Sequence, residues 1–161
     1  MKDLVVILHN VRSIYNVGSI FRTADAAGVS KIYLAGITPA PIDRFGKTKP
    51  RFAKVSLGAE KSVPWEKFAS AAKPLHRLKK ENYKIFAVEQ SKKSVPYYKT
   101  PEFHTAASSL CLVLGNEVSG LPPAVLRLAD KILEIPMRGK KESLNVGVAF
   151  GIVVFGLLYG D

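Results

Sequence analysis

Five short apolar runs, separated by helix-like segments, constrain the fold of this chain more than any other feature. They are rich in aliphatic and β-branched residues and occupy residues 4–8, 30–35, 84–88, 110–114 and 132–135. Their apolar residues follow one another without polar alternation, which is typical of strands that are covered on both faces. Because helical patterns lie between several of the runs, the sequence predicts an α/β domain with a mostly parallel sheet flanked by helices.

Four helices are expected between and after these strands. They span about 17–27, part of 65–81, a short segment after Pro122 and Pro123, and about 143–159. Asn16 is a good N-cap for the first helix, and Gly28 is suited to end it. With no repeat or linker and enough length for one sizeable core, residues 1–161 are expected to form a single domain.

The last expected helix is apolar on all sides. One stripe holds Val146, Ala149, Phe150, Val153, Val154, Leu157 and Leu158, and the other face carries Gly147, Val148, Gly151, Ile152, Phe155 and Gly156. Such a helix has to be buried all round, whereas a single sheet covers one side. Gly147 and Gly151 would allow another backbone to approach, so we expect part of this helix to lie in a homodimer interface. A fully internal helix is the alternative.

The chain is strongly basic, with a net charge of +11 and a sequence pI near 9.8. This charge indicates a polyanionic partner, either nucleic acid or an anionic membrane. No amphipathic basic helix is evident, and the apolar stretch 146–159 is too short to span a bilayer, so a membrane partner is not expected. Solubility alone is the simpler explanation of the charge.

The cations are concentrated in the segment 37–64, which is expected to be a basic loop. It contains Arg44, Lys47, Lys49, Arg51 and Lys54, and Asp43 is its only acid before residue 60. The segment is either a solvated connection or a surface that follows phosphates. Given the overall charge, we favour the second interpretation.

Several functional classes lack their sequence signals. The phosphate-binding GxxxxGK[ST] loop, the dinucleotide GxGxxG motif, a catalytic triad spacing and an acidic metal cluster are not found. His9, His76 and His104 have no metal-ligand spacing, and the single cysteine, Cys111, reads as a core residue. No metal is therefore expected. The chain starts directly with a strand-like run instead of an export signal, so a cytoplasmic location is expected.

Three polar segments, 10–22, 114–122 and 135–146, follow three of the predicted strands. In parallel α/β sheets, ligands bind at the carboxyl ends of the strands. Gly115 and Gly120 permit a tight turn that exposes backbone donors and acceptors. The three segments are therefore predicted to form one pocket rich in backbone polar groups.

Side chains in these segments have structural alternatives when taken singly. Arg22 could be an exposed helix residue paired with Asp25, and Glu117 a polar turn residue near a helix start. Ser143 could be the N-cap of the last helix. Asn145 is harder to explain in this way, because it opens an apolar helix, where a buried amide needs partners.

As an ordered set, these residues resemble the SpoU/TrmH family of RNA ribose methyltransferases, within the SPOUT superclass. The resemblance covers nearly the whole chain and includes SLGAEKSVP at 56–64. Its matching residues are Asn16 and Arg22 in NVGSIFRTADAAG; Gly115, Asn116, Glu117 and Gly120 in LGNEVSG; and Ile135, Pro136, Met137, Ser143, Leu144 and Asn145 in IPM…SLNV.

The resemblance implies a deep C-terminal trefoil knot, a homodimer, and S-adenosylmethionine as the cofactor. The implied cofactor contacts are Val88, Leu114, Gly115, Ile135, Met137, Ser143 and Leu144. The implied catalytic set is Arg22 beside the ribose hydroxyl, Asn16 and Asn145 as orienting groups, Glu117 as a support, and Ser143. Arg22 is expected to orient the hydroxyl as a cation, and the alternative is that it acts as the base. RNA contacts are expected at Asn10, Arg12, Arg44, Lys47, Lys49, Arg51, Lys54 and Arg138.

The resemblance leaves the substrate and the reaction partly open. Relatives that modify ribosomal RNA can carry an added N-terminal RNA-binding domain, which this chain lacks, so transfer RNA is the expected substrate rather than ribosomal RNA. One alternative is an RNA-binding module of the same fold without transfer activity. The other is an RNA base methyltransferase of the same superclass.

Overall fold

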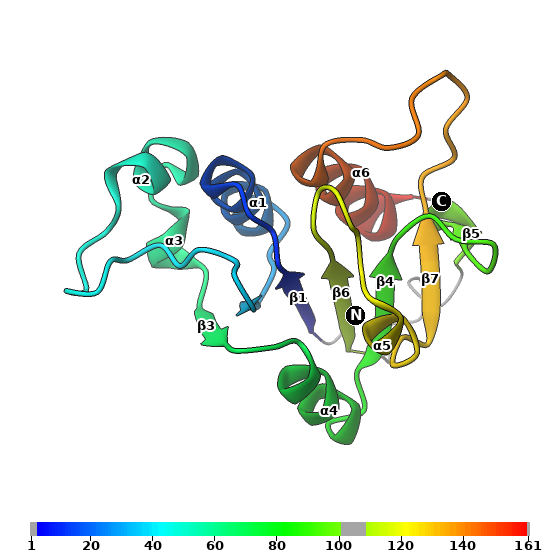
Figure 1. The fold of residues 1–161 in the computed structure, drawn as a ribbon, viewed down its shortest axis with the longest axis horizontal. Coiled ribbons are helices and arrows are strands. Elements are labelled where there is room, and N and C mark those ends of the chain that lie inside the picture. The colour runs from blue at the N-terminus through cyan, green and yellow to red at the C-terminus, as the bar shows by residue number, and fades with distance from the viewer. Residues whose placement is uncertain (1–2, 101–108, 161) are drawn as a thin grey trace.

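A computed structural model of the chain describes residues 3–100 and 109–160 (Figure 1). Within this part, seven strands form one sheet in the order β3-β2-β1-β6-β4-β7-β5, and all neighbouring strands are parallel. The strands are β1 (Leu4–His9), β2 (Lys31–Ala35), β3 (Trp65–Phe68), β4 (Lys84–Val88), β5 (Val95–Pro96), β6 (Leu110–Leu114) and β7 (Lys131–Glu134). The predicted parallel α/β sheet is confirmed.

The register brings the carboxyl ends of the central strands to one edge of the sheet. Leu114 of β6 pairs with Leu8 of β1 on one side and with Val88 of β4 on the other. Val88 in turn pairs with Leu133 of β7. The loops that follow these four strands therefore leave the sheet side by side, as the strand-end argument requires.

The five apolar runs form strands with bounds within one residue of those predicted, but β3 and β5 were not predicted. The segment 65–81 was expected to hold one helix, and only α4 (Ala72–Lys80) is helical there. Its first residues form β3, a half-exposed strand paired with β2. Trp65 and Phe68 are three residues apart, a spacing that resembles helical periodicity.

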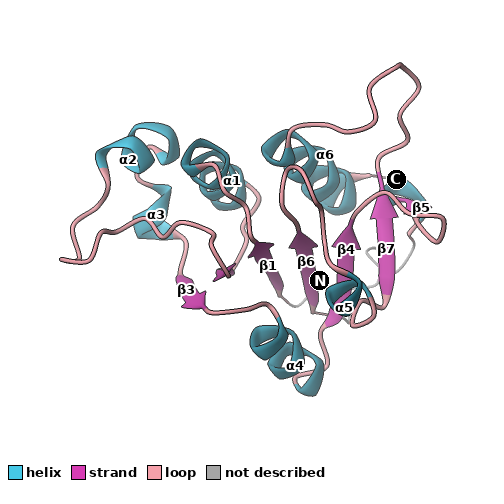
Figure 2. Cartoon of the chain, viewed as in Figure 1, coloured by secondary structure: helices cyan, strands magenta, loops and turns pink. Residues whose placement is uncertain are grey.

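Helices cover both faces of the sheet (Figure 2). On one face lie α1 (Ile14–Ala26), α2 (Pro50–Ser56), α3 (Ala59–Ser62) and α6 (Val146–Tyr159); on the other lie α4 and α5 (Pro123–Leu126). The two short helices α2 and α3 correct the expectation of a loop over 37–64. Pro50 at the first turn of α2 and the left-handed Leu57 at its end explain why this helix is short.

Both long helices begin at caps that differ from the predicted ones. Ser13, not Asn16, is the N-cap of α1, since its Oγ accepts a hydrogen bond from the Asn16 N–H. Asn145, not Ser143, is the N-cap of α6, since its Oδ1 accepts from Gly147 N and Val148 N. Both predicted caps lay within a few residues of a true one. The side chains of Asn16 and Ser143 therefore have no capping role in these helices.

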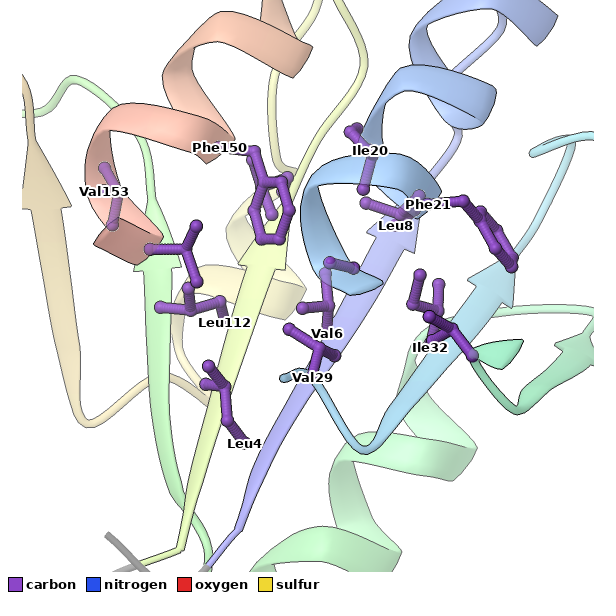
Figure 3. Packing of buried hydrophobic residues seen from close by; sticks show 14 of the residues in the cluster. Leu4, Val6, Leu8, Ile20, Phe21, Val29, Ile32, Leu112, Phe150 and Val153 are labelled. Atoms are coloured by element: carbon purple, nitrogen blue, oxygen red, sulfur yellow. The ribbon is translucent and has the colours of Figure 1, made fainter. Parts of the chain in front are cut away.

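The core consists of two layers that share the sheet. Alternate residues of each central strand face opposite sides, as with Leu4, Val6 and Leu8 of β1 on the side of α1 and α6 (Figure 3). Val5 and Ile7 face α4 and α5 instead. All five are at most 3% exposed. This burial on both faces is the physical reason for continuous apolar strands.

Helix α6 packs against α1 through the glycines that were expected to face another chain. A Cβ on Gly147 would lie 3.5 Å from Ser19 Oγ, and one on Gly151 would lie 3.8 Å from Thr23 Cγ2, both on α1. The close approach is therefore made within the chain. The outward side of α6 carries Val148, Ile152, Phe155 and Tyr159, which are 36–74% exposed.

None of the helices in the described ranges has the length and hydropathy that a bilayer crossing requires.

Candidate active site

A pocket of about 290 Å³ lies at the carboxyl ends of β4, β6 and β7. Its lining combines apolar residues from the strand ends with polar residues from the loops that follow. All seven residues predicted to contact a cofactor line this pocket: Val88, Leu114, Gly115, Ile135, Met137, Ser143 and Leu144. Segments that are distant in the sequence thus meet at one site, as the pattern of strand ends predicts.

All the charged side chains that line the pocket are acidic. Four carboxylates line it, those of Glu89, Glu117, Glu134 and Glu142, and its lining contains no lysine or arginine. Only Glu117 belonged to the predicted site. Glu89 directly follows β4, so its place at a strand end was the signal that could have found it. A pocket with this charge favours a small cationic ligand and disfavours a phosphate.

Two glycines allow the loop after β6 to turn back on itself. A Cβ on Gly115 would lie 2.6 Å from the carbonyl carbon of Gly120, closer than real Cβ atoms come to a backbone carbon. Gly120 itself has φ +64°, in the left-handed region. The Glu89 carboxylate closes this turn from the other side, because its Oε2 accepts from Leu121 N at 2.9 Å.

A chain of three polar side chains, which we call the rim, borders the pocket: Glu117 lines it, Asn145 lies between the lining residues Leu144 and Val146, and Asn16 of α1 joins the two. Asn145 Nδ2 donates to Asn16 Oδ1 at 2.9 Å, and Asn16 Nδ2 donates to Glu117 Oε1 at 2.9 Å. Three residues predicted to be catalytic are thereby joined directly. The direction of donation is fixed, because the carboxylate of Glu117 can only accept.

Glu117 also holds the loop that leads into α1. Its Oε2 accepts from Arg12 N at 3.1 Å, and its Oε1 accepts from Ser13 N at 3.2 Å. Partial burial alone would raise the pKa of Glu117, but the hydrogen bonds from Asn16 and from the backbone outweigh burial and lower it. The residue is therefore ionised at neutral pH and fixed in position.

The neighbouring Asn116 ties two of the strand-end loops together. Its Oδ1 accepts from Val118 N and Ser119 N, and its Nδ2 donates to the Asn10 carbonyl oxygen at 2.9 Å. The Asn10 side chain is itself occupied, since its Oδ1 accepts from Ile37 N at 3.0 Å. Asn10, which was predicted to contact RNA, thus has a structural role in connecting β1 to the basic segment.

Arg22 lies apart from this network. It is exposed on α1, six residues beyond Asn16, and it does not line the pocket. It forms no hydrogen bond or ion pair within the ranges that the structure describes. The alternative pairing with Asp25 is not formed either, since Asp25 accepts from the Ser62 hydroxyl. Arg22 is therefore a free cation on the surface beside the α1–α6 contact.

The remaining predicted RNA contacts are mostly exposed. Arg12, Arg44, Lys47, Arg51, Lys54 and Arg138 present side chains to solvent. Lys49 differs, because its ammonium group donates to the Ala40 carbonyl oxygen at 2.9 Å. Five of them belong to the segment 44–54, which reaches into α2 and lies beyond α1, away from β4 and β7 (Figure 1).

The described residues contain no group of histidine, cysteine or acidic side chains that could hold a metal ion. His104 lies outside the described residues. Cys111 is fully buried in β6, and burial raises the pKa of its thiol. Its position agrees with the prediction of a core residue.

A family model matches the sequence over residues 3–155, and it describes the SpoU rRNA Methylase family. The chain is 34% identical over 154 residues to the tRNA (guanosine(18)-2′-O)-methyltransferase of Aquifex aeolicus, covering 96% of this chain and 68% of the relative. It is 32% identical to the 23S rRNA (guanosine-2′-O-)-methyltransferase RlmB of Escherichia coli K12, covering 96% of this chain and 59% of that protein.

Solved structures agree with these sequence matches. The AdoMet-bound rRNA methyltransferase of Sinorhizobium meliloti superposes with a TM-score of 0.85 at 29% identity, over 96% of this chain and 55% of that chain. The A. aeolicus TrmH/SpoU tRNA modifying enzyme superposes with a TM-score of 0.81 at 32% identity, over 98% of this chain and 75% of that chain. The chain thus spans between about half and three quarters of these relatives.

Proposed function

Since the chain belongs to the SpoU rRNA methylase family, we propose that it transfers a methyl group from S-adenosylmethionine to a ribose 2′-hydroxyl of RNA. The observation that carries this proposal is the acidic pocket at the strand ends, with the Asn145–Asn16–Glu117 chain on its rim. The names of the A. aeolicus and E. coli relatives, both guanosine 2′-O-methyltransferases, support it.

The residues of the pocket fit this cofactor. S-adenosylmethionine carries a sulfonium and an ammonium cation, which the carboxylates of Glu89, Glu134 and Glu142 complement. Val88, Ile135 and Leu144, apolar residues of the lining that are partly exposed, would offer a surface to the adenine ring. The bound cofactor supplies a methyl group that its positive sulfur already activates. The protein then has to orient the hydroxyl and assist the loss of its proton.

The side chains on the rim divide these tasks. In this proposal, Asn16 and Asn145 orient the ribose, Glu117 keeps Asn16 and the loop before α1 in place, and Ser143 contacts both cofactor and substrate. Arg22 acts as an orienting cation beside the hydroxyl and its phosphate. A guanidinium is a poor proton acceptor, so the proton passes to a phosphate oxygen or to water.

We further propose that the chain forms a homodimer through the outward side of α6. Val148, Ile152, Phe155 and Tyr159 form an exposed apolar stripe with helical spacing. Arg22 precedes Thr23, whose Cγ2 would lie 3.8 Å from a Cβ on Gly151, the residue before Ile152 of this stripe. An interface there would bring Arg22 of one chain toward the pocket of the other, which would explain why it makes no contact with its own pocket.

The test uses Arg22→Ala, with Arg127→Ala as a matched control on the opposite face of the sheet. Arg22→Ala should abolish methyl transfer while the affinity for S-adenosylhomocysteine, measured by calorimetry, stays within about twofold. Arg127→Ala should change neither. Wild-type turnover in Arg22→Ala would refute the role of Arg22.

Mixed dimers test the shared site. Coexpression of Arg22→Ala with Asn145→Ala should restore part of the activity that each variant lacks alone, because one of the two pockets then has both intact groups. An absence of complementation in isolated heterodimers would show that Arg22 serves its own chain.

The RNA class and several wider expectations remain part of the proposal. Transfer RNA is favoured over ribosomal RNA, residues 1–161 are taken as one methyltransferase domain in the cytoplasm, and the C-terminal part of the domain is taken to form the trefoil knot. The span of the family model, 3–155, supports a single domain.

Nucleoside mass spectrometry of total RNA treated with the enzyme would identify the methylated nucleotide and separate ribose from base methylation. Binding of RNA without any methyl transfer would favour the module without activity.

A further inference from the structure

The tip of the basic segment, residues 42–48, is a closed turn held by backbone and side-chain hydrogen bonds. Asp43 N donates to the Lys47 carbonyl oxygen at 2.8 Å, and Asp43 Oδ1 accepts from Phe45 N and Lys47 N. Ile42 and Thr48 form an antiparallel bridge at its base, and Gly46 has φ +78°. The turn projects beyond α2 at the far end of the molecule from β7 (Figure 1).

This turn presents an aromatic ring to solvent. Phe45 is 71% exposed, the highest value among the phenylalanines that the structure describes. The Arg44 guanidinium lies over the ring, 4.7 Å from its centroid. The ring is not needed to hold the turn, because the hydrogen bonds to Asp43 come from the backbone N–H groups of Phe45 and Lys47 and would form with a polar residue at position 45.

The surroundings of the ring are strongly cationic. Arg44, Lys47, Arg51 and Lys54 are exposed on the turn and on α2, and Asp43, whose carboxylate accepts the two N–H groups of the turn, is the only acid from residue 37 to 57. An aromatic face beside cations is the combination that binds single-stranded nucleic acid, because bases stack on the ring while the cations follow the phosphates. A paired base offers no free face to such a ring.

We propose that Phe45 is a stacking platform for an unpaired base of the RNA substrate. This inference rests on the proposed function and narrows its substrate to RNA that has an accessible unpaired base in addition to the methylated nucleotide. The ring does not line the pocket of its own chain, so the stacked base and the ribose in that pocket belong to different nucleotides. Arg44 holds the ring from one side and leaves the other face for the base.

The test compares two RNA probes of equal phosphate number, a hairpin with an unpaired loop and a blunt duplex. Phe45→Ala should weaken binding of the hairpin about tenfold, as expected for one stacked base, and leave binding of the duplex unchanged. Phe45→Trp should retain hairpin binding. Leu57→Ala, an equally accessible apolar position that is 65% exposed, is the matched control and should change neither affinity.

The salt dependence separates stacking from charge. Phe45→Ala should leave the slope of affinity against salt concentration unchanged, whereas Lys47→Ala should weaken both probes and lower the slope by about one. Equal losses for hairpin and duplex, or no loss in Phe45→Ala, would overturn the stacking role. A change of sedimentation in Phe45→Ala would instead assign the ring to a contact between copies of the chain. If the wild-type chain binds neither probe, the RNA substrate itself is wrong.

Discussion

Substitutions of Asn145 should separate the stability of α6 from the chemistry of the site. The side chain has two tasks that use different atoms. Its Oδ1 caps α6 through Gly147 N and Val148 N, at 2.9 and 3.3 Å, and its Nδ2 donates to Asn16 Oδ1. Asn145→Ala removes both and should cost about 1 kcal/mol of unfolding free energy through the cap. For a domain of this size, that lowers Tm by about 2–4 °C.

The loss of activity should be far larger than this loss of stability. Without the donor from Asn145, the Asn16 amide is held by Glu117 alone, and a misplacement of about 1 Å is enough to lower kcat/KM about 100-fold. Asn145→Ser restores a cap but not the donor, so its Tm should return close to the wild-type value while kcat/KM stays low. These two readouts, thermal unfolding and methyl transfer, can be measured on the same preparations.

Asn145→Asp sharpens the same test. A carboxylate at the N-terminus of α6 is a good cap and interacts favourably with the helix dipole. This carboxylate would, however, face the Oδ1 of Asn16 and repel it. A rotation of the Asn16 amide would not relieve the repulsion, because it would turn the same oxygen toward the Glu117 carboxylate. Tm should therefore match or exceed the wild-type value, with kcat/KM as low as in the alanine variant. Recovery of activity together with stability in Asn145→Ser would refute the role of the donor chain.

Three further predictions concern the turn, the rim and the proposed interface. Gly115→Ala should cost about 1–3 kcal/mol of stability and abolish measurable S-adenosylhomocysteine binding, because its Cβ meets backbone atoms; Gly139→Ala, with no atom nearby, should do neither. Folding lowers the pKa of Glu117, so the ionised carboxylate stabilises the fold. This stabilisation should be complete at any pH above the pKa of an ordinary glutamate, and it should be lost as the pH falls through the lower pKa of the folded state. Unfolding curves of wild type and Glu117→Gln should thus differ at pH 7 and converge in acid. Ile152→Glu should yield monomers in sedimentation, whereas Val118→Glu, at a position 87% exposed, should not alter the assembly.

The strands were predictable from the sequence because burial on both faces leaves a continuous apolar signal, and β6 is the clearest case. The two strands that were missed have no such signal. β3 is half-exposed at one edge of the sheet, and β5 has only two residues, Val95 and Pro96. Caps were less predictable, because Ser13 and Asn16 are both good capping residues and only the structure decides which one has the extended backbone of a cap.

The site was predictable to the extent that strand ends determine it. The rule that ligands bind where parallel strands end brought 10–22, 114–122 and 135–146 together, and the structure joins them through Asn16, Glu117 and Asn145. The hydrogen bond from Leu121 N to the Glu89 carboxylate depends on how two loops pack against each other. The spacing of residues along the chain could not predict it. The position of Arg22 outside the pocket depends in the same way on the direction of α1.

The distribution of charge links the pocket to the proposed dimer and to the basic segment. A chain with a net charge of +11 has four carboxylates and no cation in the lining of its pocket, so its positive charge lies elsewhere. An RNA strand is repelled by the pocket and attracted by the basic segment and by Arg22. The ribose can therefore reach the pocket only if cations outside it hold the adjacent phosphates. Neither Arg22 nor Phe45 lines the pocket of its own chain, and in the dimer proposed through α6 the cation beside the pocket would be Arg22 of the second chain. The separation of charges in one chain thus favours an active site that two chains complete.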